Sequence, residues 1–93
     1  NMAKVQIEGS DAVHECESGT RMYEAIEDGN LKVPLGCLHG HCGACVVEVV
    51  SGSLAEIKEG EKLALRAFDT EEDMRLACLA YLDGDVVVRT LKP

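Results

Sequence analysis

The chain has 93 residues, of which 46% are hydrophobic, with one phenylalanine and no tryptophan. We expect one domain, 1–93, with a small aliphatic core to whose stability a bound cofactor would contribute strongly. The formal net charge of -8 argues against nucleic acid as a partner, because phosphates would be repelled. No segment approaches about 18 apolar residues and no signal peptide precedes Val5, so we expect a cytoplasmic protein with no membrane partner.

The first predicted element is a β-hairpin. Residues 3–8 alternate apolar and polar side chains with period two, and residues 12–17 repeat this alternation less cleanly. Between them, Gly-Ser-Asp at 9–11 has the chemistry of a turn. The pattern therefore predicts two antiparallel strands at the start of the chain.

A helix is predicted next. Thr20 can serve as its N-cap, and Gly29 is expected to end it. Met22, Ala25 and Ile26 have the spacing i, i+3 and i+4, so they would share one apolar face. We expect this face to pack on the sheet.

Four cysteines form the most informative pattern in the chain. Cys37, Cys42 and Cys45 have the spacing C-x4-C-x2-C, and Cys78 follows Cys45 after 32 intervening residues. This is the ligand spacing of a plant-type [2Fe-2S] cluster, in which two thiolates complete the coordination of each iron. The sequence therefore predicts that these four cysteines are both the metal ligands and the cofactor-binding residues.

Further elements follow the three closely spaced cysteines. A strand is predicted over 46–50, with Glu48 as its polar member, and Ser51-Gly52-Ser53 is expected to close it. A short helix is expected after Gly60, and the chain is expected to end with a strand, a turn and a strand. The apolar residues of that helix are Leu63, Ala64 and Ala67, and the final elements are 76–82, 83–84 and 85–91.

The segments 37–45, 46–52 and 75–81 resemble the plant-type [2Fe-2S] ferredoxin family, especially its bacterial oxygenase-associated branch. The resemblance covers nearly the whole chain. It implies an α+β fold of the β-grasp ferredoxin-like type: a mixed sheet crossed by one main helix, with the cluster loop near the sheet edge. It also implies that Cys37 and Cys42 bind the outer iron, which holds the extra electron, and that Cys45 and Cys78 bind the inner iron.

The same resemblance implies a function. The chain would be a soluble one-electron carrier, not an enzyme, passing electrons from a flavin reductase to an oxygenase or another iron enzyme. Leu38 stands where photosynthetic members often have arginine, which favours a role in bacterial hydroxylation or aromatic degradation. Tyr81 resembles a tyrosine that the family places near the cluster, where we expect it to pack. Whether the chain is normally fused to a reductase stays open.

The acidic charge predicts the kind of partner. An oxidised cluster with four thiolates adds about -2, which brings the whole to about -10. We expect a monomer that meets a flavoprotein reductase and a terminal oxygenase or other redox enzyme through basic surfaces. Two clusters of acidic residues could form the docking face for such a partner, and the alternative is that they are only solvated surface. The clusters are Glu24, Glu27 and Asp28, and Glu71, Glu72 and Asp73.

Two other uses of the cysteines stay open. The same four thiolates could hold structural zinc in an interaction module, although zinc knuckles usually use two close pairs and Cys78 has no nearby cysteine. A thiol enzyme could use Cys42 or Cys45, but the βαβ pattern that flanks a thioredoxin-like motif is absent. A zinc protein would be colourless, which separates it from a cluster protein.

Three further residues need an interpretation. His39 lies in a partial Rieske motif, but the downstream C-x2-H pair is missing, so we expect neither it nor His41 to bind iron. Each would be an exposed loop histidine or would adjust the cluster's potential by protonation. Cys16 lies outside the ligand pattern, and we expect a small buried side chain that can be replaced with the cluster retained.

Overall fold

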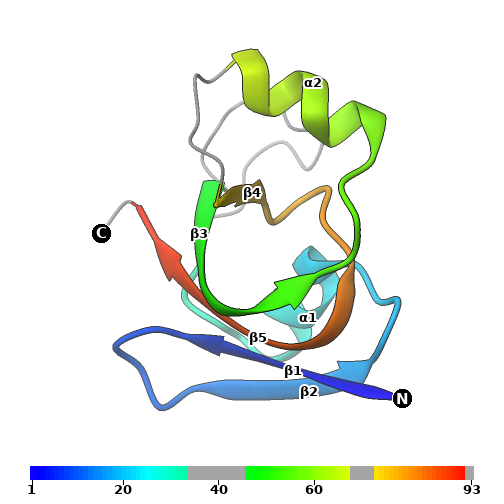
Figure 1. Cartoon of the computed structure of the whole chain (residues 1–93). Helices are drawn as coiled ribbons and strands as arrows, with labels where there is room; N and C mark the ends of the chain where they lie inside the picture. The colour runs from blue at the N-terminus through cyan, green and yellow to red at the C-terminus, as the bar shows by residue number, and fades with distance from the viewer. Residues whose placement is uncertain (34–45, 68–72, 92–93) are drawn as a thin grey trace.

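The computed structural model of the chain describes residues 1–33, 46–67 and 73–91 (Figure 1). In chain order the elements are β1 (Met2–Ile7), β2 (Val13–Glu17), α1 (Met22–Asp28), β3 (Val46–Leu54), α2 (Glu59–Ala67), β4 (Met74–Leu76) and β5 (Leu82–Thr90). No helix in these three ranges is long and apolar enough to cross a membrane. The single-domain organisation stays a prediction.

The strands form one mixed sheet in the order β2-β1-β5-β3-β4. β1 and β2 pair antiparallel, with Lys4 opposite Glu15, so the predicted N-terminal hairpin is confirmed. β1 and β5 are parallel, whereas β3 is antiparallel to both β5 and β4. Within the described ranges β2 and β4 are therefore the two edge strands.

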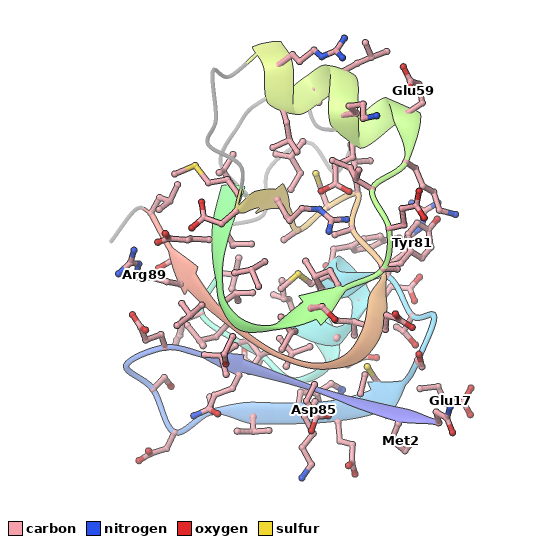
Figure 2. All side chains as sticks on the ribbon, viewed as in Figure 1. Met2, Glu17, Glu59, Tyr81, Asp85 and Arg89 are labelled. Atoms are coloured by element: carbon pink, nitrogen blue, oxygen red, sulfur yellow. The ribbon has the colours of Figure 1, made fainter. Side chains whose placement is uncertain are left out.

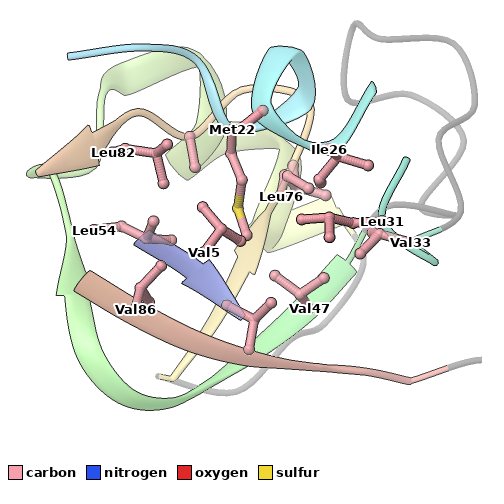
Figure 3. Close-up of a cluster of buried hydrophobic side chains, with 14 of the residues drawn as sticks. Val5, Met22, Ile26, Leu31, Val33, Val47, Leu54, Leu76, Leu82 and Val86 are labelled. Carbon is pink, nitrogen blue, oxygen red and sulfur yellow. The ribbon is translucent and has the colours of Figure 1, made fainter. Parts of the chain in front are cut away.

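The hydrophobic core lies between the sheet and α1 (Figure 3). In β1 the alternation seen in the sequence buries Ala3, Val5 and Ile7. From α1 the predicted face of Met22, Ala25 and Ile26 is buried, which confirms that prediction. Burying one aliphatic side chain of this size contributes about 1.5 to 3 kcal/mol. Members from the other elements include Leu31, Val33, Val47, Leu54, Leu65, Leu76, Leu82, Val86 and Val88.

The ends of α1 differ from the prediction. Arg21, not Thr20, occupies the N-cap position and makes no side-chain cap hydrogen bond, since a guanidinium has no acceptor. The Thr20 side chain bonds to the Cys16 thiol instead. At the other end, Gly29 has an ordinary φ of -86°, and the left-handed residue is Asn30, with φ 51°.

Backbone hydrogen bonds explain where α1 stops. The N-H of Leu31 donates to the carbonyl of Ile26 at 2.9 Å, and the N-H of Asn30 donates to that of Glu27 at 3.2 Å. These two bonds define a Schellman motif, in which asparagine takes the left-handed position more often given to glycine.

β3 does not end at Ser51-Gly52-Ser53 as predicted. It continues to Leu54, and its pairing with β5 shifts register between Val49 and Ser51 and again between Gly52 and Leu54. Gly52 has a φ of 76°, and a Cβ there would overlap with the carbonyl oxygen of Asp85. The turn-forming residues therefore make bulges inside a long strand, where the glycine allows the β5 backbone to come close.

The C-terminal prediction is wrong in two places. The expected strand 76–82 is a short β4 that ends at Leu76, followed by a turn. The expected turn 83–84 lies inside β5, which runs without interruption from Leu82 to Thr90. Pairing with β1 and β3 holds this segment extended despite its local turn chemistry.

The predicted second helix is present as α2. α2 begins at Glu59, one residue before Gly60, and Leu63 is 54% exposed. The side chains that turn inward are Glu61 and Leu65, at 2% and 9% exposure. Because these two are four residues apart, they share one face of the helix.

Replacing Gly52 with alanine should destabilise the protein by about 3 kcal/mol, through left-handed backbone strain and overlap with β5. Gly9 has a similar φ of 85°, but a Cβ added there would have no atom within 4 Å, so Gly9→Ala is the matched control. It should cost only about 1 kcal/mol. Thermal unfolding of both variants tests this, and equal midpoints would show that the close approach of β5 at Gly52 carries no cost.

Candidate functional site

Cys78 lies in the turn that follows the edge strand β4. The carbonyl of Leu76 accepts hydrogen bonds from the N-H groups of Leu79 at 3.0 Å and Ala80 at 2.9 Å, which close this turn around the cysteine. Cys78 is fully buried, as is the neighbouring Ala77. The turn therefore holds a potential metal-binding sulfur in an apolar, water-excluding environment.

The other three predicted ligands, Cys37, Cys42 and Cys45, lie outside the described residues. Within the described ranges no group of three or more potential metal-binding side chains occurs. The ligand assignment as a whole stays a prediction.

The described residue that follows Cys45 in sequence is Val46, and it is paired with Leu76 across β3 and β4. Residues directly opposite in an antiparallel pair have Cα atoms about 4.5 to 5.5 Å apart. In sequence, Val46 directly follows Cys45, and Leu76 is two residues before Cys78. The paired strands β3 and β4 are therefore adjacent in sequence to two predicted ligands, Cys45 and Cys78.

A buried ion pair joins β4 to α2, which lies beside it in Figure 1. Glu61 accepts from Arg75 Nε at 2.6 Å and from Arg75 Nη2 at 2.9 Å, so the guanidinium binds the carboxylate through two bonds. The same carboxylate accepts the backbone N-H of Leu76 at 3.1 Å. Arg75 Nη2 also donates to the carbonyl of Ala55 at 3.0 Å.

This Glu61–Arg75 pair was missed from the sequence. A glutamate in the first turn of a helix is usually exposed, and the residues that suggested this helix were the apolar Leu63, Ala64 and Ala67. The available signal was the spacing of Glu61 four residues before Leu65, which places both on one face.

Tyr81, labelled in Figure 2, lies three residues after Cys78 and is half-buried. The Nζ of Lys58 is 4.4 Å from its ring centroid, and the guanidinium carbon of Arg21 is 5.3 Å from it. The Tyr81 carbonyl accepts the N-H of Ala55 at 2.9 Å. The tyrosine therefore packs between two cations where three segments meet, which agrees with the expected packing role.

Cys16 lies on β2, the opposite edge strand from β4, and packs half-buried against the core. Burial raises the pKa of its thiol, and the negative charges of Asp28 and Glu15 raise it further, against a lowering by the Thr20 hydrogen bond. A raised pKa leaves little thiolate at neutral pH, so Cys16 is a packing residue with low reactivity.

Some of the remaining candidate residues lie in the described ranges and others lie outside them. Glu24, Glu27 and Asp28 are exposed on α1, as predicted, and Asp73 is exposed just before β4. The candidates that lie outside the described ranges are His39, His41, Glu71 and Glu72.

Comparison with known proteins gives a family match. The family model described as the 2Fe-2S iron-sulfur cluster binding domain matches residues 5–83. The chain is 34% identical over 84 residues to the reductase component of phenol 2-monooxygenase from Pseudomonas sp. (strain CF600), and this covers 90% of the chain and 24% of that protein. It is 31% identical over 74 residues to Ferredoxin-2 of Leptolyngbya boryana, covering 80% of the chain and 72% of that protein.

A solved structure gives the fold. The ISC-like [2Fe-2S] ferredoxin from Pseudomonas putida superposes with a TM-score of 0.70 at 22% identity, over 99% of this chain and 93% of that one. The predicted β-grasp ferredoxin-like fold is confirmed. The chain spans about a quarter of the oxygenase reductase component named above, so the activity of that whole protein is not transferred to it.

The residues present fit a [2Fe-2S] cofactor. The sequence supplies four thiolates at the required spacing, and the described one, Cys78, is buried in an apolar turn beside a strand pair that leads to Cys45. With the family match, the prediction of a [2Fe-2S] cluster is confirmed.

Cys78→Ala should lose most of the visible absorption of the purified protein, because a buried ligand is removed and the remaining three thiolates cannot complete both irons. Cys16→Ala, the matched control, should keep the absorption and the iron content of the original protein. Iron analysis and visible spectra of both variants test this pair. A Cys78→Ala protein with full colour would remove Cys78 from the ligand set.

Proposed function

Because the chain belongs to the 2Fe-2S iron-sulfur cluster binding domain family, we propose that it serves an oxygenase system as its one-electron carrier. It would receive electrons from a flavin reductase and pass them to an oxygenase or another iron enzyme. The observation that carries the proposal is the match over residues 5–83, together with similarity to the reductase component of a monooxygenase.

The domain itself is an electron-transfer unit rather than an enzyme, as predicted. When bound, the cluster supplies a centre that accepts and donates one electron, at a potential on the order of -400 mV for plant-type centres. In the proposal Cys37, Cys42, Cys45 and Cys78 hold it. The family match favours iron and sulfide over the zinc-binding alternative that the sequence left open.

The chain's own residues bind and shield the cluster. Fully buried side chains around Cys78, including Leu76, Ala77 and Ala80, exclude water from this ligand. Water exclusion and the apolar surroundings adjust the potential, because they change the cost of adding charge. The surface then determines the partner.

An acidic face supports the proposal of basic partners. Glu24, Glu27 and Asp28 are exposed on α1, and the N-H of Met22 at the start of this helix donates to the carbonyl of Ala80 at 2.9 Å. α1 is therefore attached directly to the turn that holds Cys78. A partner attracted by these carboxylates would meet the helix whose first residue is bonded to this turn.

The relatives allow two arrangements of the whole protein. The chain covers 72% of a ferredoxin but 24% of an oxygenase reductase component, so the domain occurs both nearly alone and as part of a longer chain. In either arrangement the same cluster would pass the electron to the acceptor. The monomeric state and the cytoplasmic location stay predictions.

The visible absorption spectrum, recorded anaerobically before and after dithionite, is the first test of the electron carrier. Broad bands that bleach partly on reduction are expected, with about one electron taken up per cluster. A colourless protein that contains zinc would overturn the proposal.

Steering by the acidic face has its own test. We expect the variant Glu24→Gln, Glu27→Gln, Asp28→Asn to be reduced about tenfold more slowly by a flavin reductase from a bacterial aromatic oxygenase system, at low salt. The difference should disappear in about 1 M salt, which screens charges beyond a few ångströms. Stopped-flow bleaching measures the rate.

The matched control makes the same change of charge on β2 and in the preceding turn, with Asp11→Asn, Glu15→Gln and Glu17→Gln, all exposed. Its reduction rate should stay within about twofold of the original. Equal losses in the two triple variants would show that net charge, and not the α1 face, governs the encounter.

A further inference from the structure

We propose that Glu61 and Arg75 are positioning residues for the cluster, which hold the strand pair that leads into two of its ligands. The inference rests on the ligand set of the proposed function. It adds a role for two residues on α2 and β4 that do not themselves bind the cluster.

The geometry of Glu61 is the first step. Its carboxylate is 2% exposed and accepts three hydrogen bonds, two from Arg75 and one from the N-H of Leu76. A bidentate contact between arginine and a carboxylate fixes direction as well as distance. The carboxylate therefore holds both the Arg75 side chain and the backbone of β4 in one position.

The backbone contact has a structural reason. β4 is an edge strand and pairs with β3 alone among the described strands, so its outward N-H groups have no strand to bind. The N-H of Leu76 is buried, and a buried N-H without an acceptor is costly. The Glu61 carboxylate on α2 supplies this acceptor, which in the middle of a sheet would be a carbonyl of the next strand.

A purely stabilising role is a weak explanation for this ion pair. Taking two charges out of water costs nearly as much as their attraction returns, and apolar replacements are often as stable. What an apolar pair would not supply is a directional link that joins β4 to α2 and, through Arg75 and the carbonyl of Ala55, to the segment that follows β3. The pair therefore contributes position more than stability.

The held strand pair leads to the ligands. Leu76 is opposite Val46, which follows Cys45, and its carbonyl closes the turn that holds Cys78. The family resemblance assigns Cys45 and Cys78 to the same iron. A shift of Leu76 would thus disturb both the turn that holds Cys78 and the strand residue that follows Cys45. Groups that orient metal ligands typically change metal affinity about 10- to 100-fold when they are removed.

The test compares the release of iron from intact holoprotein to an excess of chelator. Glu61→Gln should release iron about tenfold faster and should change the visible circular dichroism, which reports the geometry at the cluster. The control is Arg89→Gln, which breaks the exposed ion pair between Arg89 and Glu48 across β5 and β3. Its release rate and its dichroism should equal those of the original protein.

A second control separates positioning from general loosening of α2. Leu65→Ala removes a buried side chain from the same face of α2 and leaves the Glu61–Arg75 pair in place. It should lower the melting temperature with little change in visible dichroism. If Leu65→Ala alters the dichroism as much as Glu61→Gln does, the pair acts only through the stability of α2 and the inference is overturned.

Arg75→Lys keeps the experiment decisive if Glu61→Gln yields no folded protein. Lysine keeps the charge but loses the bidentate contact, so we expect a rate of iron release between the rates of Glu61→Gln and of the original protein. An unchanged rate overturns the inference.

Cys78→Ala separates failure of the positioning role from failure of the proposed function. Loss of the cluster in Cys78→Ala with normal release from Glu61→Gln and Arg75→Lys would reject the positioning role alone, whereas a full cluster in Cys78→Ala would reject the ligand set.

Discussion

The backbone of Leu76 is the point on which the described part of the site depends. Its N-H donates to the buried carboxylate of Glu61, its carbonyl accepts two N-H groups of the turn around Cys78, and its Cα lies opposite Val46 in β3. Its side chain is fully buried in the core. A helix, a strand and a ligand-bearing turn thus meet at one residue, so the position of Cys78 follows from the packing of the fold.

The contacts of Glu61 with β4 also cover an edge strand of the sheet. An edge strand with unpaired N-H groups invites pairing with another chain, and short length and a covering element are two ways in which proteins prevent it. β4 has three residues and α2 covers it through Glu61 and Arg75. The chain then turns at Leu76, whose carbonyl accepts the N-H groups of Leu79 and Ala80, and the turn buries Cys78.

How much the sequence predicted depends on how local each feature is. The alternation at 3–8 and the face of Met22, Ala25 and Ile26 depend on neighbouring residues and could be interpreted directly. The cysteine spacing could be interpreted because it matches a known ligand pattern, although Cys78 is distant in sequence. Gly52, Asp83 and Gly84 have turn chemistry but lie inside strands, because pairing with distant segments overrides local preference. The spacing to Leu65 could place Glu61 on the inner face of its helix, but its ion pair could not be identified because Arg75 is 14 residues away on β4.

Glu24 in the first turn of α1 follows the local rule for helices, but other charges at the two ends of this helix are placed against it. Its last turn contains Glu27 and Asp28 and no basic residue, although the helix dipole disfavours acids there by about 0.3 to 1 kcal/mol each. At the other end, Arg21 occupies the N-cap, also against the dipole, and packs on Tyr81. Residues that break a local rule are expected at functional positions. The helix joined to the Cys78 turn therefore has a cation at its N-cap and carboxylates along its exposed face and in its last turn, an asymmetry that would orient a charged partner as well as attract it.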